Sequence, residues 1–134
     1  MAYQESQPEV SIVANTTFAN SDLYKLVGIS TDGQVVIGAT TASDVFGTLL
    51  SVTGTTSGAG IETVTVGLFQ GIGKVNMAAS TRDRGQTVAA SSAGLGIAPT
   101  TDAGTLGIAL DGSSGSAGRI FSVLFGSGFN VEAT

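Results

Sequence analysis

The side chains that most often carry out catalysis are missing from this chain. Its 134 residues include no histidine and no cysteine. Ser-His-Asp and Cys-His nucleophile systems, the common zinc ligand sets and disulfides are therefore excluded. The composition predicts a protein that is not an enzyme, with no catalytic residue, no metal site and no cofactor.

Ten carboxylates remain as general acids or bases. Most lie beside Gly, Ser, Thr or Asn, where roles in turns and in solubility suffice; Asp32 and Asp111 each precede a glycine. The stretch "GLFQGIGKVN" (67–76) matches neither the Walker pattern nor a dinucleotide fingerprint, and "TDAGTLG" (101–107) lacks the calcium-loop pattern. An enzyme that uses two carboxylates is therefore less favoured than a structural protein or a binding module.

Charge argues against a nucleic-acid partner. The net charge is −5, with five Lys and Arg residues in all, and Arg82 and Arg84 flank Asp83. Binding through phosphate neutralisation needs a basic stripe, which is absent. No apolar stretch approaches the ~18 residues of a membrane span, so no membrane partner is expected. The N-terminus lacks the basic and apolar regions of a secretory signal, which predicts a soluble protein that is made in the cytoplasm.

The elements that must position any site are short strands. Apolar residues make up 42% of the chain, charged residues 11%, and there are 20 glycines. Apolar, β-branched runs separated by Gly, Ser and Thr favour antiparallel strands, and no sustained helical period occurs outside a short stretch near 78–84. The strand candidates are 23–30, 35–40, 45–52, 61–68, 73–79, 95–100 and 105–112, with the extended part of 81–91 that follows a turn at 84–85 and the apolar run that begins the final stretch 119–131. The fold class is therefore all-β, a small antiparallel barrel or sandwich with little helix.

The predicted organisation is one barrel with an extended arm. Residues 1–17 are polar and form the arm, and residues 18–134 form a single β-barrel domain with a C-terminal tail from about 126. Val10 and Ile12 alternate with Ser11, so part of the arm can pair with a sheet edge.

Two segments of the chain have similar sequences. Residues 56–67 read "TSGAGIETVTVG" and residues 115–126 read "GSAGRIFSVLFG". Each is the second half of a predicted hairpin whose loop ends in Ala-Gly. An internal repeat and the ordinary reuse of hairpins in β proteins both account for this pattern.

The last strand is apolar on both faces. Phe121, Val123 and Phe125 share one face, and Ile120 and Leu124 share the other. A small barrel uses only one face of a strand for its core. We therefore expect the second face to meet another subunit rather than to be covered by the arm.

The order of segments resembles the phage capsid cement, or head decoration, proteins. The resemblance covers Phe18 to Phe125. It depends on these segments in order: "FANSDLYKLVGISTDGQVVIGAT", "DVFGTLLSV", a loop ending in Ala-Gly, "IETVTVGLFQGIGKVNM", "DRGQTVAASSAG" and "TLGIALDGSSGSAGRIFSVLF". The chain departs from the family in the loop 53–60 and in the tail 126–134.

The resemblance implies a structural role on a virion. It implies a small β-barrel that forms a homotrimer, lies on the exterior of the phage head, binds the major capsid protein near three-fold and quasi-three-fold positions and stabilises the expanded capsid. It brings no catalytic residues. The residues expected to contact the capsid are Tyr3, Pro8, Val10, Ile12 and Phe18. The residues expected at the trimer interface are Phe121, Val123, Phe125 and Phe129.

A binding module is the alternative. A receptor- or carbohydrate-binding domain of a virion fibre can have the same β composition. Aromatic residues exposed in loops would favour it, and here the aromatic residues lie mainly in strand candidates, apart from Tyr3 and Phe129.

Overall fold

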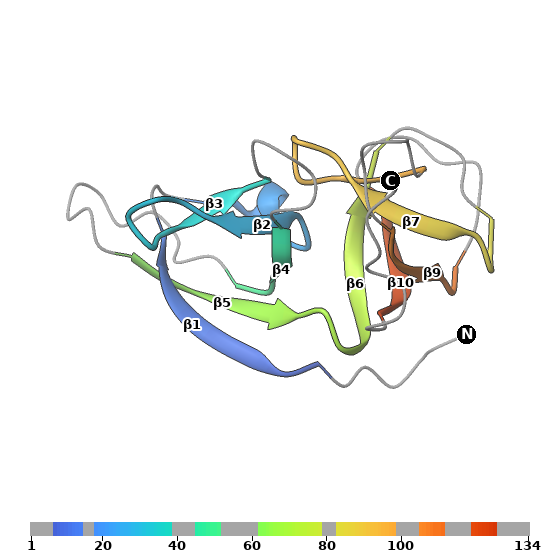
Figure 1. Ribbon diagram of the computed structural model, residues 1–134, viewed down its shortest axis with the longest axis horizontal. Coiled ribbons are helices and arrows are strands. Elements are labelled where there is room, and N and C mark those ends of the chain that lie inside the picture. Colours follow the sequence, from blue (N-terminus) through green and yellow to red (C-terminus); the bar gives the residue numbers. More distant parts are fainter. Residues whose placement is uncertain are drawn as a thin grey trace.

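Ten short strands form two closed five-stranded barrels that lie side by side (Figure 1). The structure is a computed structural model, and it describes residues 7–14, 18–38, 45–51, 62–78, 83–98, 105–111 and 119–125. Barrel 1 consists of β1 (Glu9–Ala14), β2 (Leu26–Ile29), β3 (Val35–Ile37), β4 (Val45–Leu49) and β5 (Glu62–Leu68), with a 3₁₀ turn at Asn20–Asp22. Barrel 2 consists of β6 (Gly71–Met77), β7 (Thr87–Ala90), β8 (Gly96–Ile97), β9 (Thr105–Ala109) and β10 (Arg119–Phe125).

The two barrels have the same topology. In barrel 1 the strand order is β1-β3-β2-β4-β5, and in barrel 2 it is β6-β8-β7-β9-β10. Each barrel is closed by pairing of its first strand with its last, β1 with β5 and β6 with β10. The first and third strands of each barrel pair in parallel, through Ala14 and Val35 or through Met77 and Gly96. All other pairs are antiparallel. The chain is therefore a tandem structural repeat, which decides the alternative that the sequence left open.

Local irregularities recur at equivalent positions. The pairing of the second and fourth strands skips one residue in each barrel, Phe46 in β4 and Leu106 in β9. An unpaired bulge residue can turn its side chain away from the regular alternation. Phe46 and Leu106 both contact the core of their own barrel.

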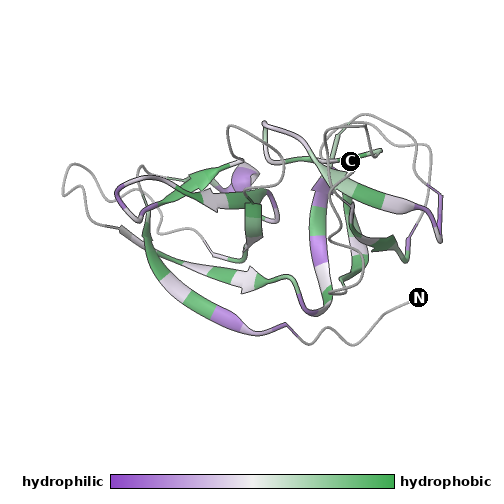
Figure 2. Ribbon diagram, in the orientation of Figure 1, coloured by the Kyte–Doolittle hydropathy of each residue, from purple (hydrophilic) through white to green (hydrophobic). Residues whose placement is uncertain are grey.

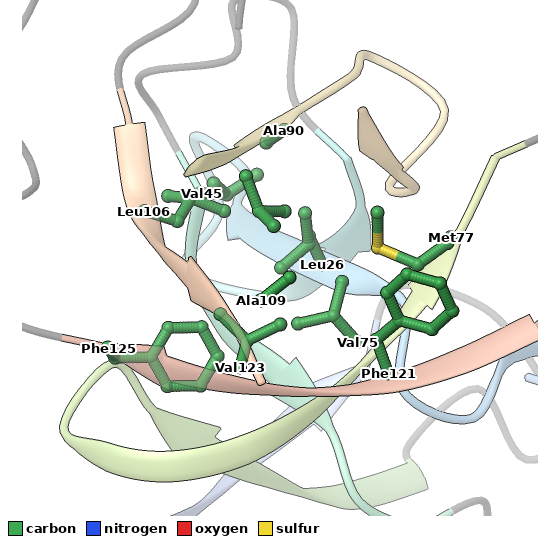
Figure 3. Packing of buried hydrophobic residues seen from close by; sticks show 11 residues of the cluster. Leu26, Val45, Val75, Met77, Ala90, Leu106, Ala109, Phe121, Val123 and Phe125 are labelled. Atoms are coloured by element: carbon green, nitrogen blue, oxygen red, sulfur yellow. The ribbon is translucent and has the colours of Figure 1, made fainter. Parts of the chain in front are cut away.

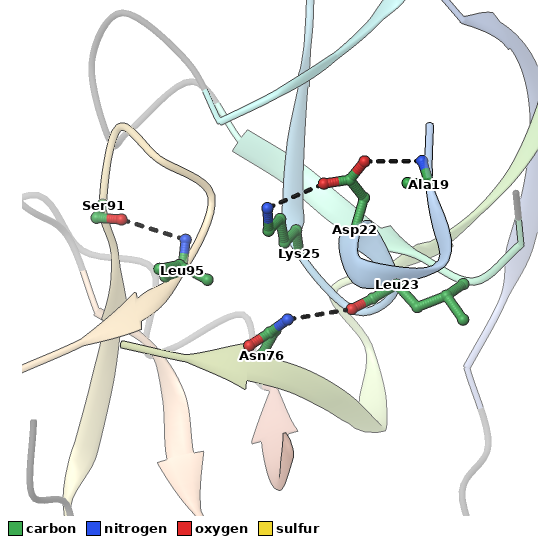
Figure 4. Close-up of polar contacts among 7 residues, drawn as sticks. All are labelled: Ala19, Asp22, Leu23, Lys25, Asn76, Ser91 and Leu95. Atoms are coloured by element: carbon green, nitrogen blue, oxygen red, sulfur yellow. Dashed lines mark hydrogen bonds and ion pairs between the residues drawn. The ribbon is translucent and has the colours of Figure 1, made fainter. Parts of the chain in front are cut away.

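The turn between the second and third strands also recurs. In residues 30–34 the N–H of Ser30 donates to the carbonyl of Gln34 at 2.8 Å, and the Gln34 N–H donates to the Ser30 hydroxyl at 3.2 Å. In residues 91–95 the corresponding bonds measure 2.9 and 3.2 Å, the second drawn in Figure 4. The fourth residue of each turn is a glycine with positive φ, as such tight hairpins require.

Alternation along the strands builds the two cores. In β5, Val64 and Val66 are buried while Thr63 is exposed, as the sequence predicts. Hydrophobic and hydrophilic residues likewise alternate along β6 (Figure 2). Each fully buried valine or phenylalanine contributes about 1.5–3 kcal/mol through removal of apolar area from water.

The core of barrel 2 includes residues from barrel 1. Leu26 of β2 and Val45 of β4 point out of barrel 1 and join the cluster that contains Val75, Phe121 and Val123 (Figure 3). The core of barrel 2 therefore depends on barrel 1, whereas the core cluster of barrel 1 consists, among the described residues, of its own side chains.

The all-β fold class is confirmed, and the single barrel is corrected to two. The predicted arm also differs, because residues 9–14 form β1, which pairs with β5 over six residues. Apolar alternation predicts a strand there, but it cannot distinguish a strand added at an edge from one that closes a barrel. The short helix considered near 78–84 falls largely outside the described residues.

The repeat supplies a matched pair of glycine substitutions. A Cβ at Gly33 would meet nothing within 4 Å, whereas a Cβ at the equivalent Gly94 would lie 2.8 Å from the Leu26 carbonyl oxygen and 2.9 Å from Ile37 Cγ2. We predict that Gly33→Ala costs about 1 kcal/mol from positive φ alone. Gly94→Ala adds overpacking between the barrels and costs about 1–3 kcal/mol more. Urea unfolding of both variants measures the difference, and equal losses would contradict this barrel–barrel contact.

Candidate functional site

Tyr24 lies where the two barrels meet. Its N–H donates to the Leu49 carbonyl of barrel 1 at 2.7 Å, and its carbonyl accepts from the Asn76 N–H of barrel 2 at 2.8 Å. Two residues later, the Leu26 N–H donates to the Gly94 carbonyl of barrel 2 at 2.7 Å. We call this contact region, residues 24–26 with Asn76 and Gly94, the barrel–barrel interface.

The backbone of Tyr24 is strained. Its φ is +66°, and no other described residue except glycine has a positive φ. The equivalent residue of barrel 2 is Gly85, with φ +87°, and its N–H donates to the Ala109 carbonyl at 2.7 Å just as that of Tyr24 does to Leu49. The shared turn thus requires a left-handed residue, and a tyrosine there costs about 1–2 kcal/mol relative to glycine.

A pocket opens beside Tyr24. Its volume is about 310 Å³, and it is lined by Gln7, Glu9, Tyr24 and Leu50. Lys74 of β6 is not one of the described lining residues, and its Nζ lies 5.7 Å from the centroid of the Tyr24 ring. The pocket therefore combines an aromatic residue, an amide and a carboxylate.

The side chain of Gln7 is fixed in this region. Its Nε2 donates to the Leu68 carbonyl at 2.9 Å and to the Thr48 hydroxyl at 3.3 Å. A Cβ at Gly67 or Gly73 would collide with this side chain, so the two glycines make the space that it occupies. The amide is accordingly held before any ligand arrives.

Asp22 and Lys25, which flank Tyr24 in the sequence, form a charged turn. Asp22 accepts hydrogen bonds of 2.9 Å from the Lys25 ammonium and from the Ala19 N–H (Figure 4). Burial raises the pKa of Asp22, but the hydrogen bonds from Lys25 and Ala19 and the Lys25 charge outweigh it and hold the pKa below its ordinary value.

The side-chain contact of Asn76 across the interface is weak. Its Nδ2 lies 3.5 Å from the Leu23 carbonyl (Figure 4), and its buried Oδ1 has no hydrogen-bond partner. The backbone hydrogen bonds and the apolar burial of Leu26 therefore account for most of the attachment between the barrels.

A second surface lies on the outside of barrel 2. Leu124 of β10 stands opposite Ile72 of β6 and Ile108 of β9, and Leu124 and Ile120 are 37% and 45% exposed. We call Ile72, Ile108, Ile120 and Leu124 the apolar outer face.

The repeat shows that this face is specific to barrel 2. The positions in barrel 1 that match Ile72, Leu124 and Ile108 by register are Glu9, Gly67 and Thr48. Gln7 also bonds to Thr48 and lies against Gly67. In barrel 1 this row of positions is not apolar, and Gln7 of the same chain covers part of it. In barrel 2 the equivalent row is apolar and partly exposed.

The predicted trimer-interface residues lie elsewhere. Phe121, Val123 and Phe125 are 2%, 0% and 3% exposed in the core of barrel 2, and Phe129 lies outside the described residues. The prediction that one face of this strand forms the core holds, but the assignment of the faces was wrong. Alternation does not predict which of two apolar faces points inward. Here the face with the rings of Phe121 and Phe125 forms the core.

The predicted capsid-contact residues are divided. Phe18 is 2% exposed in the core of barrel 1, and Ile12 is half-buried against that core, so Phe18 is not available for contact. Pro8 and Val10 are exposed, and Tyr3 lies outside the described residues.

Sequence reasoning missed the pocket and its strained tyrosine. Aligning "DLYK" (22–25) with "DRGQ" (83–86) places Tyr24 against a glycine, which is the signal that could have found it. Within the described ranges, no three Asp, Glu, His or Cys residues gather as metal ligands, and no helix is long and apolar enough to cross a membrane.

Comparison with known proteins relates the fold to a solved structure. No protein-family model and no curated protein matches the sequence. The structure is similar to the N base of the head fiber gp8.5 of bacteriophage phi29, with a TM-score of 0.58 and 16% identity. The match covers 93% of this chain and 99% of that chain, so the tandem-barrel fold is shared over nearly its whole length.

The charged turn gives a pH-dependent prediction. Because the folded pKa of Asp22 is lowered, its contribution to stability is complete above the unfolded pKa and is lost as the pH falls through the folded pKa. We predict that Asp22→Asn costs about 1 kcal/mol at pH 7 and that the difference from wild type vanishes at strongly acidic pH. Urea unfolding from pH 7 to pH 2 measures this. A difference that does not change with pH would contradict it.

Proposed function

We propose that this protein is a structural component of a bacteriophage virion, a head decoration protein that binds the exterior of the capsid as a homotrimer. The observation that carries the proposal is the shared tandem-barrel fold with the base of a phage head fiber over 93% of the chain. The resemblance of the sequence to the cement proteins supports the same role. Its partners would be the major capsid protein and two further copies of itself.

The composition suits such a role. The chain has no histidine or cysteine and only 11% charged residues, so it offers few reactive groups. A structural role also agrees with the proposal that the protein is not an enzyme, because a coat protein acts by binding alone.

The energetic logic is mass action. A protein that binds only the expanded capsid lattice stabilises it by about 4 kcal/mol at a thousandfold excess over Kd. A trimer converts the second and third contacts into intramolecular ones, which raises affinity by roughly 10²–10⁴. Weak contacts from each copy therefore suffice.

Self-association is assigned to the apolar outer face. Ile120 and Leu124 are the exposed large hydrophobic residues of barrel 2 among those described, and they stand on one face of β10. This replaces Phe121, Val123 and Phe125 in the trimer hypothesis while it keeps the same strand.

The trimer is tested by charge insertion on that face. We predict that Ile120→Glu and Leu124→Glu convert the trimer to monomers, because each buries a charge at about 2 kcal/mol or more per copy. Light scattering measures the mass. Ile29→Glu is the matched control, since Ile29 is 46% exposed but lies on barrel 1. A monomeric wild type, or variants that remain trimeric, would overturn the assignment.

Capsid binding is tested with the segment that precedes β1. Deletion of residues 2–16 would remove β1 and open barrel 1, so the informative variant lacks residues 2–6 only. We predict that this variant unfolds at the same urea concentration as wild type but binds expanded phage heads lacking the protein roughly 10²-fold more weakly. Co-sedimentation measures binding. Equal binding would exclude the arm as the contact, and no binding of the wild type would contradict the proposed function.

A further inference from the structure

We propose that the pocket beside Tyr24 binds a saccharide. The pocket lies at the barrel–barrel interface and is lined by Gln7, Glu9, Tyr24 and Leu50. This inference goes beyond the structural role and does not depend on it.

The repeat is the first argument for a ligand at Tyr24. Both barrels use the same left-handed turn, and barrel 2 fills it with Gly85, which needs no compensation. Barrel 1 carries a tyrosine at φ +66° instead. Strain of this kind persists only where the surroundings over-determine it, and it concentrates at ligand sites. The bonds from Leu49 and Asn76 supply that constraint.

Pre-organisation is the second argument. The amide of Gln7 is held by Thr48 and Leu68, and the backbone of Tyr24 is held by both barrels. A ligand therefore finds an amide and an aromatic residue already in position, which lowers the entropic cost of binding.

The chemistry of the lining favours a neutral ligand rich in hydroxyl groups. An aromatic ring offers an apolar surface to the C–H face of a sugar, while the Glu9 carboxylate and the side-chain oxygen of Gln7 can accept hydrogen bonds from hydroxyls. Leu50 adds apolar contact. Among the described lining residues Glu9 is a carboxylate and none is a cation, which disfavours phosphate and other anions.

The size of the pocket points the same way. A volume of about 310 Å³ is at the small end of ligand pockets, so it suits one or two sugar rings rather than a helix or a folded domain.

The experiment is NMR titration of the full ¹⁵N-labelled chain with single sugars. The probes are glucose, galactose, N-acetylglucosamine and N-acetylgalactosamine, each raised to millimolar concentration. The expected result is that at least one of them shifts the amide signals of Gln7, Glu9, Tyr24 and Leu50 and leaves barrel 2 residues distant from the interface unchanged. If none of the four produces localised shifts, the proposal is overturned.

Three variants separate the ring from the backbone. Tyr24→Gly removes the ring and relieves the positive φ, so it should retain the fold in the spectrum while it weakens binding at least tenfold. Tyr24→Phe keeps the ring and should bind within about threefold of wild type if the ring surface carries the contact. Glu9→Gln, at an exposed position, should also weaken binding without a change in the spectrum of barrel 2. Unchanged affinity in both Tyr24→Gly and Glu9→Gln would overturn the site.

A competing occupant is a peptide from another protein. Titration with the major capsid protein of the parent phage tests it on the same signals. Shifts at the four lining residues with the capsid protein and with none of the sugars would refute the saccharide assignment. Because head binding is measured separately by co-sedimentation, failure of the sugar site leaves the proposed decoration function intact.

Discussion

The attachment of the two barrels depends on three consecutive residues of one chain segment. The backbone of Tyr24 is hydrogen-bonded to Leu49 in its own barrel and to Asn76 in the other, and the Leu26 N–H reaches Gly94 across the same boundary. The Leu26 side chain then enters the core of barrel 2. Because backbone bonds and apolar burial are joined here, any change in this segment is transmitted to both barrels at once.

Duplication explains how so small a chain carries different surfaces on one scaffold. Topology, bulges, turns and even single hydrogen bonds recur in both barrels, whereas outward-facing positions do not. Glu9 and Thr48 in barrel 1 correspond to Ile72 and Ile108 in barrel 2. The repeated interior fixes the fold, and the exterior is free to differ, so the two surfaces with candidate functions lie on different barrels.

Much of the fold could be predicted from the sequence, because the alternation in β5 and the Asp-Gly turn at Gly33 are local signals. The hairpins β4–β5 and β9–β10 were predicted for the same reason. The second barrel could not be, since strand closure depends on pairs distant in sequence, such as β1 with β5. The candidate site was missed because a tyrosine does not by itself indicate positive φ, and the signal appears only when Tyr24 is aligned with Gly85 of the repeat. The choice between the two apolar faces of β10 is made only by packing.

The contact between the barrels is head-to-tail, and such contacts can in principle add further units without end. Barrel 1 presents Leu26 and Val45 to its neighbour, and the matching positions of barrel 2 are Thr87 and Thr105. Those threonines do not provide comparable apolar side chains that could enter the core of a third barrel. The change from Leu26 and Val45 to Thr87 and Thr105 therefore disfavours the packing of a further barrel in the same head-to-tail manner.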